Sequence, residues 1–355
     1  MKKILTLVLC LCMVLTLATM FASCGEADYK LGMGVVVNMA ESKAGNAQVD
    51  ATVATVVTDA DGKIVACRID VAQNKMAITE GAVDTTLTFK TKMEKGAAYG
   101  MAGNQYSTDN NNDGVIKEWD EQAKAFEKFV VGKTVAEVEA MIKAENLQTV
   151  NGHVITKDAD LLAAGCTIQI GDFVTAVVKA CKDEQGMSFT AKEGSFTLGV
   201  AAASFVDSAT VAATADKDGT VAMYTDFAAS VVADGKILAS LNDAIQPTIA
   251  ITIDGVPTPA EFKGTKRELK EGYTMSTSKW SSDNNEDGVI KEWYIQSAEF
   301  SKYVVGKTAD EVAAMETQTL AGHEVAKDDT LLKAGCTIQI TAIKAVVAQS
   351  AKNAR

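Results

Sequence analysis

The alternation of apolar and polar residues predicts β-structure in the first part of the chain. Segment 47–70, AQVDATVATVVTDADGKIVACRID, alternates apolar residues on both sides of the pair Asp61–Gly62. A period of two is typical of a half-buried strand, and an Asp-Gly pair between two such runs indicates a hairpin turn. We therefore expect an antiparallel hairpin here. A further strand is expected in DTTLTFKTK, residues 84–92.

The next part of the chain has helical spacing. Ile116, Trp119, Ala123, Phe126 and Val130 recur at intervals of three and four residues, which places them on one face of an α-helix. The simplest interpretation of these apolar residues is packing into a core. We therefore expect an amphipathic helix across this stretch.

Start signals place the helices that follow. Thr134 is expected to begin a helix, because Glu137 stands three residues later and completes a capping box. Thr308 and Glu311 repeat this box later in the chain. A last helix of the same half is expected at about residues 172–181.

Nearly the whole pattern occurs twice. The matching segments are DNNNDGVIKEW and DNNEDGVIKEW (109–119 and 283–293), FVVGKTVAEVEAM and YVVGKTADEVAAM (129–141 and 303–315), and LLAAGCTIQI and LLKAGCTIQI (161–170 and 331–340). A period of about 170 residues indicates two duplicated domains, because solenoids repeat at much shorter intervals.

These patterns predict the α+β class, with two duplicated domains that each have an antiparallel sheet half followed by a helical half. The length of 355 residues and the hydrophobic content of 47% are sufficient for two cores. We expect a processed segment at 1–24, a first repeat at 25–184 and a second repeat at 185–355.

The N-terminus is typical of a secretory signal. Lys2 and Lys3 precede a long apolar run that ends in FASC, with Cys24 as its last residue. This end resembles the lipobox of bacterial lipoproteins, in which the cysteine is lipidated and becomes the mature N-terminus. An uncleaved membrane helix is the alternative, because the run is long enough to span a bilayer. We favour the lipoprotein, which predicts an extracytoplasmic protein held at the cell membrane by a lipid on Cys24.

Composition narrows the possible partners. The formal net charge is −12, and an acidic surface repels phosphate backbones, so nucleic acid is excluded as an expected partner. The cysteines after Cys24 show no CxxC spacing, which argues against a zinc site or a thioredoxin-like motif. Cys166 and Cys336 occupy matching positions in the two repeats and are expected to be buried.

The first repeated motif fits part of a calcium-loop template. Asp109, Asn111 and Asp113 fall at positions 1, 3 and 5, Gly114 at position 6 and Asp120 at position 12. Hard Ca²⁺ needs six to eight oxygen ligands, and this spacing supplies most of them. The alternative is a turn that starts a helix, since Asn, Asp and Gly favour turns and Asp accepts N–H bonds at helix starts.

The second copy of this motif is a poorer calcium loop. Asp283, Asn285, Asp287 and Gly288 return, but position 12 is Tyr294, whose side chain does not close the shell. Calcium is therefore expected chiefly in the first copy. Its expected role is to fix the strand half against the helical half.

Other recurring polar residues leave their role open. His153 and His323 stand in matching contexts, and one histidine per domain favours a structural loop residue over a metal centre. The pairs Lys92/Lys266 and Glu94/Glu268 also recur. They are compatible with a salt-bridged element or with the lining of a pocket, and the sequence does not decide between these.

The segment LLAAGCTIQIGDFVTAVVKA resembles the end of FMN-binding domains of bacterial extracytoplasmic redox proteins, in which a Gly-Ala-Thr turn precedes a helix and the threonine carries FMN. Both repeats are also similar to anaerobe lipoproteins of this kind in the order of their motifs. That order is DGKI, TKxE…YGM, KEW…Q…F…YVVGKT and a terminal helix. The resemblance implies six cofactor-binding residues: Gly165, Cys166, Thr167, Gly335, Cys336 and Thr337. An aromatic residue beside the flavin would be Tyr99 or Tyr273.

The resemblance implies a flavin-binding lipoprotein, with a possible role in extracytoplasmic electron transfer to a partner that the sequence does not name. The alternative is a non-redox binding or structural lipoprotein with the same fold, in which calcium would serve to stabilise the protein. A binding protein or electron carrier is expected rather than an enzyme, because no Ser/His/Asp order, HExxH or P-loop stands in the sequence.

Overall fold

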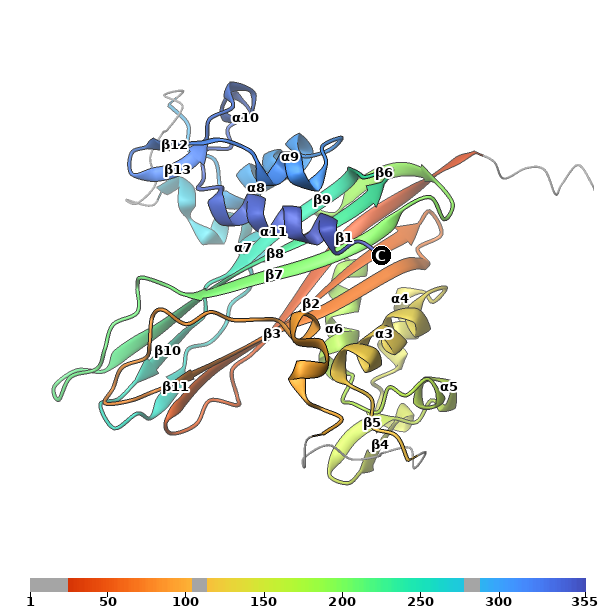
Figure 1. The fold of residues 1–355 in the computed structure, drawn as a ribbon, viewed down its shortest axis with the longest axis horizontal. Helices are drawn as coiled ribbons and strands as arrows, with labels where there is room; N and C mark the ends of the chain where they lie inside the picture. Colours follow the sequence, from red (N-terminus) through yellow and green to blue (C-terminus); the bar gives the residue numbers. More distant parts are fainter. Residues whose placement is uncertain (1–24, 104–113, 278–287) are drawn as a thin grey trace, which may run out of the picture.

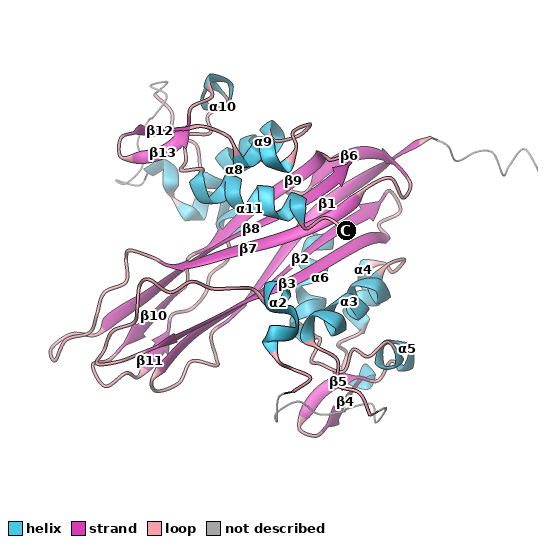
Figure 2. Cartoon of the chain, viewed as in Figure 1, coloured by secondary structure: helices cyan, strands magenta, loops and turns pink. Residues whose placement is uncertain are grey.

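Two antiparallel sheets form the centre of the molecule, and each carries helices on its outer face (Figure 1). The computed structural model describes residues 25–103, 114–277 and 288–355. Figure 2 shows the long strands of both sheets running side by side, with one group of helices on either side of them. The expected α+β class is confirmed.

The first sheet has the strand order β3-β2-β1-β6. Its strands are β1 (Glu26–Asn38), β2 (Asn46–Asp59), β3 (Ile64–Ala77) and β6 (Met187–Lys192). The elements between β3 and β6 are α2 (Lys92–Lys95), η1 (Gly96–Tyr99), α3 (Trp119–Val130), α4 (Val135–Ala140), η2 (Ala144–Asn146), β4 (Leu147–Val150), β5 (His153–Thr156), α5 (Ala159–Ala163) and α6 (Gly171–Cys181).

The second sheet has the order β11-β10-β8-β7, and β9 also pairs with β8. Its strands are β7 (Thr197–Val206), β8 (Gly219–Ala233), β9 (Lys236–Ile245), β10 (Thr248–Ile251) and β11 (Pro257–Pro259). The elements that follow are α7 (Lys266–Leu269), η3 (Lys270–Tyr273), η4 (Met275–Thr277), α8 (Trp293–Tyr303), α9 (Ala309–Ala313), β12 (Thr317–Leu320), β13 (His323–Ala326), α10 (Asp329–Lys333) and α11 (Thr341–Lys352).

The two sheets share one hydrophobic core. Side chains of β1 and β2 meet side chains of β7, β8 and β9 between the sheets. The larger buried members are Leu31, Met33, Val35, Val53, Val57, Leu198, Phe227, Val231, Leu241 and Ile245. Because each sheet buries its inner face against the other, the two repeats are layers of one sandwich.

The expected repeat boundary does not separate two sheets. Strand β6 follows residue 184, yet it pairs antiparallel with β1, from Glu26 opposite Lys192 to Leu31 opposite Met187. A strand from the segment assigned to the second repeat thus completes the sheet of the first.

Matching glycines bring the last helix of each repeat close to its sheet. A Cβ atom on Gly32 of β1 would lie 2.0 Å from the carbonyl oxygen of Ala180 in α6. A Cβ atom on Gly199 of β7 would lie 1.9 Å from the carbonyl oxygen of Ser350 in α11. No larger residue permits this approach without movement of the helix.

Several local expectations are confirmed. Strands β2 and β3 form the predicted hairpin around Asp61 and Gly62. The capping boxes of Thr134 with Glu137 and of Thr308 with Glu311 are present at α4 and α9. The expected last helix of the first half is α6.

Two local expectations are wrong. Residues 84–92 do not form a strand, because Asp84 Oδ1 accepts bonds from the N–H and the hydroxyl of Thr86 at 2.8 and 2.7 Å and holds a turn. Ile116 precedes the helix, since α3 begins at Trp119; the other four apolar residues of the pattern are buried on one face.

The close sheet–helix contact predicts unequal effects of two glycine substitutions. Gly32→Ala should lower the free energy of unfolding by ~1–3 kcal/mol, because the added methyl group meets helix backbone. Gly171→Ala, at the start of α6 and with open space around it, should leave stability unchanged or slightly raised. Urea denaturation measures both, and equal stabilities would contradict the proposed tight contact.

Candidate functional site

The residues predicted to bind flavin lie together in one buried turn per half. The N–H and hydroxyl of Thr167 donate to Gln122 Oε1 at 2.8 and 3.3 Å. Thr337 makes the same bonds to Gln296 at 2.7 and 3.2 Å. Each threonine is 8% exposed. A glutamine on the neighbouring helix therefore holds the turn that leads to the last helix of each half.

The rest of each turn is also packed. Gly165 and Gly335 adopt left-handed backbone angles, with φ of 86° and 85°, at the end of a short helix. Cys166 and Cys336 are fully buried, as expected, and burial raises the pKa of each thiol to about 12. Buried thiols of this kind are unreactive.

A basic depression lies beside the first of these turns. Its volume is about 480 Å³. It is lined by Lys117, Glu121, Lys124, Ala125, Lys128, Phe129 and Ala164. Lys117 Nζ donates to the carbonyl oxygen of Ala164 at 2.8 Å, immediately before Gly165. Positive charge and one aromatic ring thus stand next to the predicted flavin turn.

Most of the predicted calcium ligands lie outside the described residues, as does Cys24. This holds for Asp109, Asn111 and Asp113. The fourth predicted ligand, Asp120, lies in the first turn of α3 and forms a salt bridge of 2.6 Å with Lys124. Within 25–103, 114–277 and 288–355, no group of three or more His, Cys, Asp or Glu side chains is placed to hold a metal ion. Calcium binding stays a prediction.

The two histidines occupy equivalent places. His153 begins β5 and His323 begins β13, each after a tight turn in a small two-stranded sheet.

The described part of the chain contains no helix long and apolar enough to span a membrane.

The recurring glutamates form helix caps. Glu94 Oε2 accepts the N–H of Thr91 at 2.8 Å, and Thr91 Oγ1 accepts the N–H of Glu94 at 3.1 Å. Glu268 and Thr265 repeat these bonds at 3.0 and 3.2 Å. Reciprocal bonds of this kind satisfy free N–H groups at a helix start, so these glutamates have a structural role.

A buried aspartate from the third strand of each repeat anchors the same short helix. Asp70 Oδ1 accepts the N–H of Met93 at 3.1 Å, and Asp243 Oδ1 accepts the N–H of Arg267 at 3.1 Å. The two aspartates are 2% and 5% exposed. This bond fixes α2 and α7 on their sheets and directs the recurring lysines inward.

Lys266 is the more deeply buried of the two lysines. It is 6% exposed, and its Nζ donates to Tyr224 Oη at 2.8 Å. The Nζ atom lies 4.6, 4.8 and 5.3 Å from the ring centroids of Tyr224, Tyr273 and Trp293. Aromatic faces attract a cation at such distances. Lys92 of the first half has a similar setting, 5.1 and 5.3 Å from the rings of Tyr99 and Trp119.

Burial shifts the protonation of the charged groups around Lys266. It raises the pKa of Asp226 to about 7 and that of Asp243 to about 6, and it lowers the pKa of Lys266 to about 8. Attraction to Lys266 opposes the raised pKa of Asp226, and attraction to Arg267 opposes the raised pKa of Asp243, without cancelling either shift. Asp226 Oδ2 also lacks a hydrogen-bond partner among the described residues.

The two halves differ next to this lysine, because one strand of the second half is interrupted where its counterpart in the first half is continuous. Strands β9 and β10 both pair with β8, but β9 ends at Ile245 and β10 begins at Thr248. Pro247, in the gap, has no N–H to donate to a ladder. In the first half, β3 runs unbroken through Gln73 and Asn74, which match Gln246 and Pro247 in the repeat.

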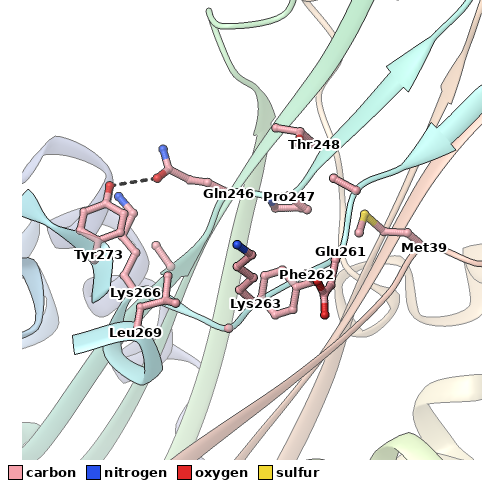
Figure 3. Close-up of a pocket in the computed structure, with 13 residues that line it drawn as sticks. Met39, Gln246, Pro247, Thr248, Glu261, Phe262, Lys263, Lys266, Leu269 and Tyr273 are labelled. Atoms are coloured by element: carbon pink, nitrogen blue, oxygen red, sulfur yellow. Dashed lines mark hydrogen bonds between the residues drawn. The ribbon is translucent and has the colours of Figure 1, made fainter. Parts of the chain in front are cut away.

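A cavity of about 250 Å³ lies at this break. It is lined by Met39, Ala244, Gln246, Pro247, Thr248, Ala260, Glu261, Phe262, Lys263, Gly264, Lys266, Leu269 and Tyr273. Figure 3 shows Lys266 and Tyr273 on one side, Phe262 and Met39 on the other, and Lys263 between them. The Tyr273 hydroxyl donates to Gln246 Oε1 at 2.9 Å. The cavity combines apolar walls with two amines, which is typical of a site for a small anionic molecule.

The sequence pointed to part of this site. The recurrence of Lys266 and the choice of Tyr273 as an aromatic candidate were visible in the repeat. Asp226, Asp243 and Pro247 were missed. The sequence contains signals for all three. Asp226 and Asp243 are charged residues within apolar strand segments. The three prolines of the chain are clustered at 247, 257 and 259, and proline is confined to the edges and ends of strands.

The pKa shifts predict how stability depends on pH. A carboxyl whose folded pKa is raised stabilises the fold at low pH, and this contribution is lost as the pH rises through the folded pKa, here between about 4 and 7. Asp226→Asn should therefore gain stability relative to the natural protein over this window, by at most ~1.4 kcal/mol per pH unit.

Thermal denaturation at pH 4.5 and pH 7.5 measures this difference. Asp254→Asn, on an exposed turn, is the control and should show no such gain. If Asp226→Asn becomes relatively less stable at the higher pH, the attraction to Lys266 outweighs the cost of burial and the account of this cluster is wrong.

Comparison with models of protein families, with curated proteins and with solved structures finds no match to this chain.

Proposed function

We propose that the protein is a lipid-anchored extracytoplasmic binding protein that takes up a small anionic molecule in the cavity beside Lys266. The observation that carries this proposal is the cavity itself, which lies where the strand is interrupted at Pro247, next to a buried lysine. A buried amine requires compensation of its charge, and a ligand anion adds to the compensation that Asp226 and Asp243 supply.

The repeat supports the assignment to the second half. Lys92 and Lys266 occupy equivalent positions, each facing aromatic rings. The strand beside Lys92 continues through Asn74, whereas the strand beside Lys266 stops before Pro247. Both halves thus have a lysine among aromatic rings, but only the second half has an interrupted strand beside it. The proposed binding site is therefore assigned to the second half.

Filling the cavity tests this function. Leu269 is half-buried on the cavity wall, so Leu269→Trp should block the site and abolish the binding of any small anion that the natural protein takes up. Lys95→Trp, at the matching position of the first half, is the control and should retain binding. Saturation-transfer NMR with a set of small carboxylates measures both. Binding that survives Leu269→Trp would place the site elsewhere.

Flavin binding is a second candidate function. It is favoured by the depression that Lys117, Lys124, Lys128 and Phe129 form beside the Gly165–Thr167 turn, because lysines attract a phosphate and an aromatic ring stacks on a flavin. In that case the protein is an extracytoplasmic electron carrier. The cavity at Lys266, of about 250 Å³, is too small for a whole FMN molecule, so the two candidate functions belong to different places in the structure.

A visible absorption spectrum tests the flavin candidate. The mature protein is purified from its native host and then precipitated with acid. Yellow supernatant means non-covalent FMN, and colour in the pellet means flavin attached to Thr167 or Thr337. A colourless protein that leaves the spectrum of added FMN unchanged contradicts this candidate.

The lipid anchor is tested separately. Cys24→Ser should release the protein from the membrane fraction into the soluble extracytoplasmic fraction, because the lipid can no longer be attached. Fractionation followed by immunoblotting measures the distribution. A variant that stays with the membrane would support an uncleaved N-terminal helix instead.

A further inference from the structure

We propose that the natural ligand class of the Lys266 cavity is a single-ring aromatic carboxylate, with its carboxylate at Lys263 and Lys266 and its ring among Phe262, Met39 and Leu269. This inference rests on the proposed binding function and adds the chemistry of the ligand. Three properties of the cavity carry it: its size, the separation of its charged and apolar parts, and its position at the junction of the two repeats.

The size limits the ligand to one ring. The cavity of about 250 Å³ lies just below the range of ~300–1,000 Å³ that is usual for small-molecule sites. A single ring with one short substituent fits such a volume. Fused-ring cofactors, nucleotides and peptides exceed it.

The amines select an acid. Lys263 is exposed at the cavity and forms no salt bridge with any described residue, so its charge is available. Lys266 is buried, and its Nζ uses one bond, to Tyr224. An ammonium group has three donors, so further donors remain for a ligand oxygen. Glu261 is the one carboxylate on the cavity wall, and it is exposed.

The apolar side of the cavity selects a ring. Phe262 is half-buried and packs against both the shared core and a second apolar cluster that includes Met39 and Ile251, and these contacts fix its position. Met39 is 8% exposed and comes from the loop after β1, in the other repeat. A thioether and an aromatic side chain favour contact with a flat aromatic ring over contact with water. Figure 3 shows these two side chains opposite Lys266, with Lys263 in between.

The test uses the mature full chain and three probes: benzoate, its neutral analogue benzamide, and acetate, which lacks the ring. Titration is followed by NMR or calorimetry. Benzoate should bind about tenfold more tightly than either analogue, because one lacks the charge and the other lacks the ring contact. Lys263→Gln should weaken benzoate binding about twofold to fivefold, as is usual for an exposed charge.

Two further variants keep the test decisive. Lys266→Met should remove most of the affinity, and if this variant does not fold, Leu269→Trp replaces it by filling the cavity without removing a charge. Lys95→Trp is the control and should bind benzoate as the natural protein does.

The outcomes separate the ligand class from the function. If benzamide binds as tightly as benzoate and Leu269→Trp abolishes both, the cavity binds ligands but the assignment of an acid is wrong. If acetate binds as tightly as benzoate, the ring is not recognised and the aromatic assignment is wrong. Binding at the cavity is binding that Leu269→Trp abolishes. If neither the three probes nor the other small carboxylates show such binding, the proposed binding function fails together with this inference.

Discussion

The packing of two apolar sheet faces against each other is the interaction on which the rest of the structure depends. Each repeat supplies one sheet whose inner face carries large apolar side chains such as Leu31 and Phe227, and this face is buried by the other sheet. The stabilisation comes from removing apolar area from water, which grows with the area covered. Further contacts join the repeats: β6 pairs with β1, and Arg267 bonds the buried carboxylate of Asp183 at 3.1 Å.

The candidate site follows from this arrangement. Sheet packing brings Met39 of the first repeat against the segment that holds Phe262 in the second, and both line the cavity beside Lys266. The lysine itself is placed by α7, which Asp243 and the cap of Thr265 fix on the sheet. Both repeats carry this lysine and the buried aspartate that fixes its helix, and the lysine is buried in the second repeat. Pro247 stands where the first repeat has Asn74, and the strand is interrupted at Pro247 but continuous at Asn74. The proposed binding cavity uses this difference between the two halves.

Sequence patterns predicted the elements that depend on local chemistry. The hairpin at Asp61–Gly62 and the box at Thr134 were predictable because a few neighbouring residues determine them. Segment 84–92 has a strand-like pattern but begins with a turn, in which the Asp84 side chain accepts the bond of the Thr86 N–H, and no strand follows before α2. The face-to-face packing joins residues such as Leu31 and Phe227, 196 positions apart, and Met39 lies 223 positions from Phe262; one sequence contains no direct signal for such contacts. The glutamines that bond the threonines of the predicted flavin turns, Gln122 and Gln296, lie more than 40 positions away from them, and no sequence pattern predicted these bonds.

The central claim is that the two repeats form one folding unit and complete each other's structure. Differential scanning calorimetry of the mature chain tests it most directly, together with the second repeat produced alone as residues 185–355. The account predicts a single cooperative transition for the whole chain, with a calorimetric enthalpy equal to the van't Hoff enthalpy, and no folding transition for the isolated repeat. Two separate transitions in the whole chain, one of them matched by the isolated repeat, would contradict it.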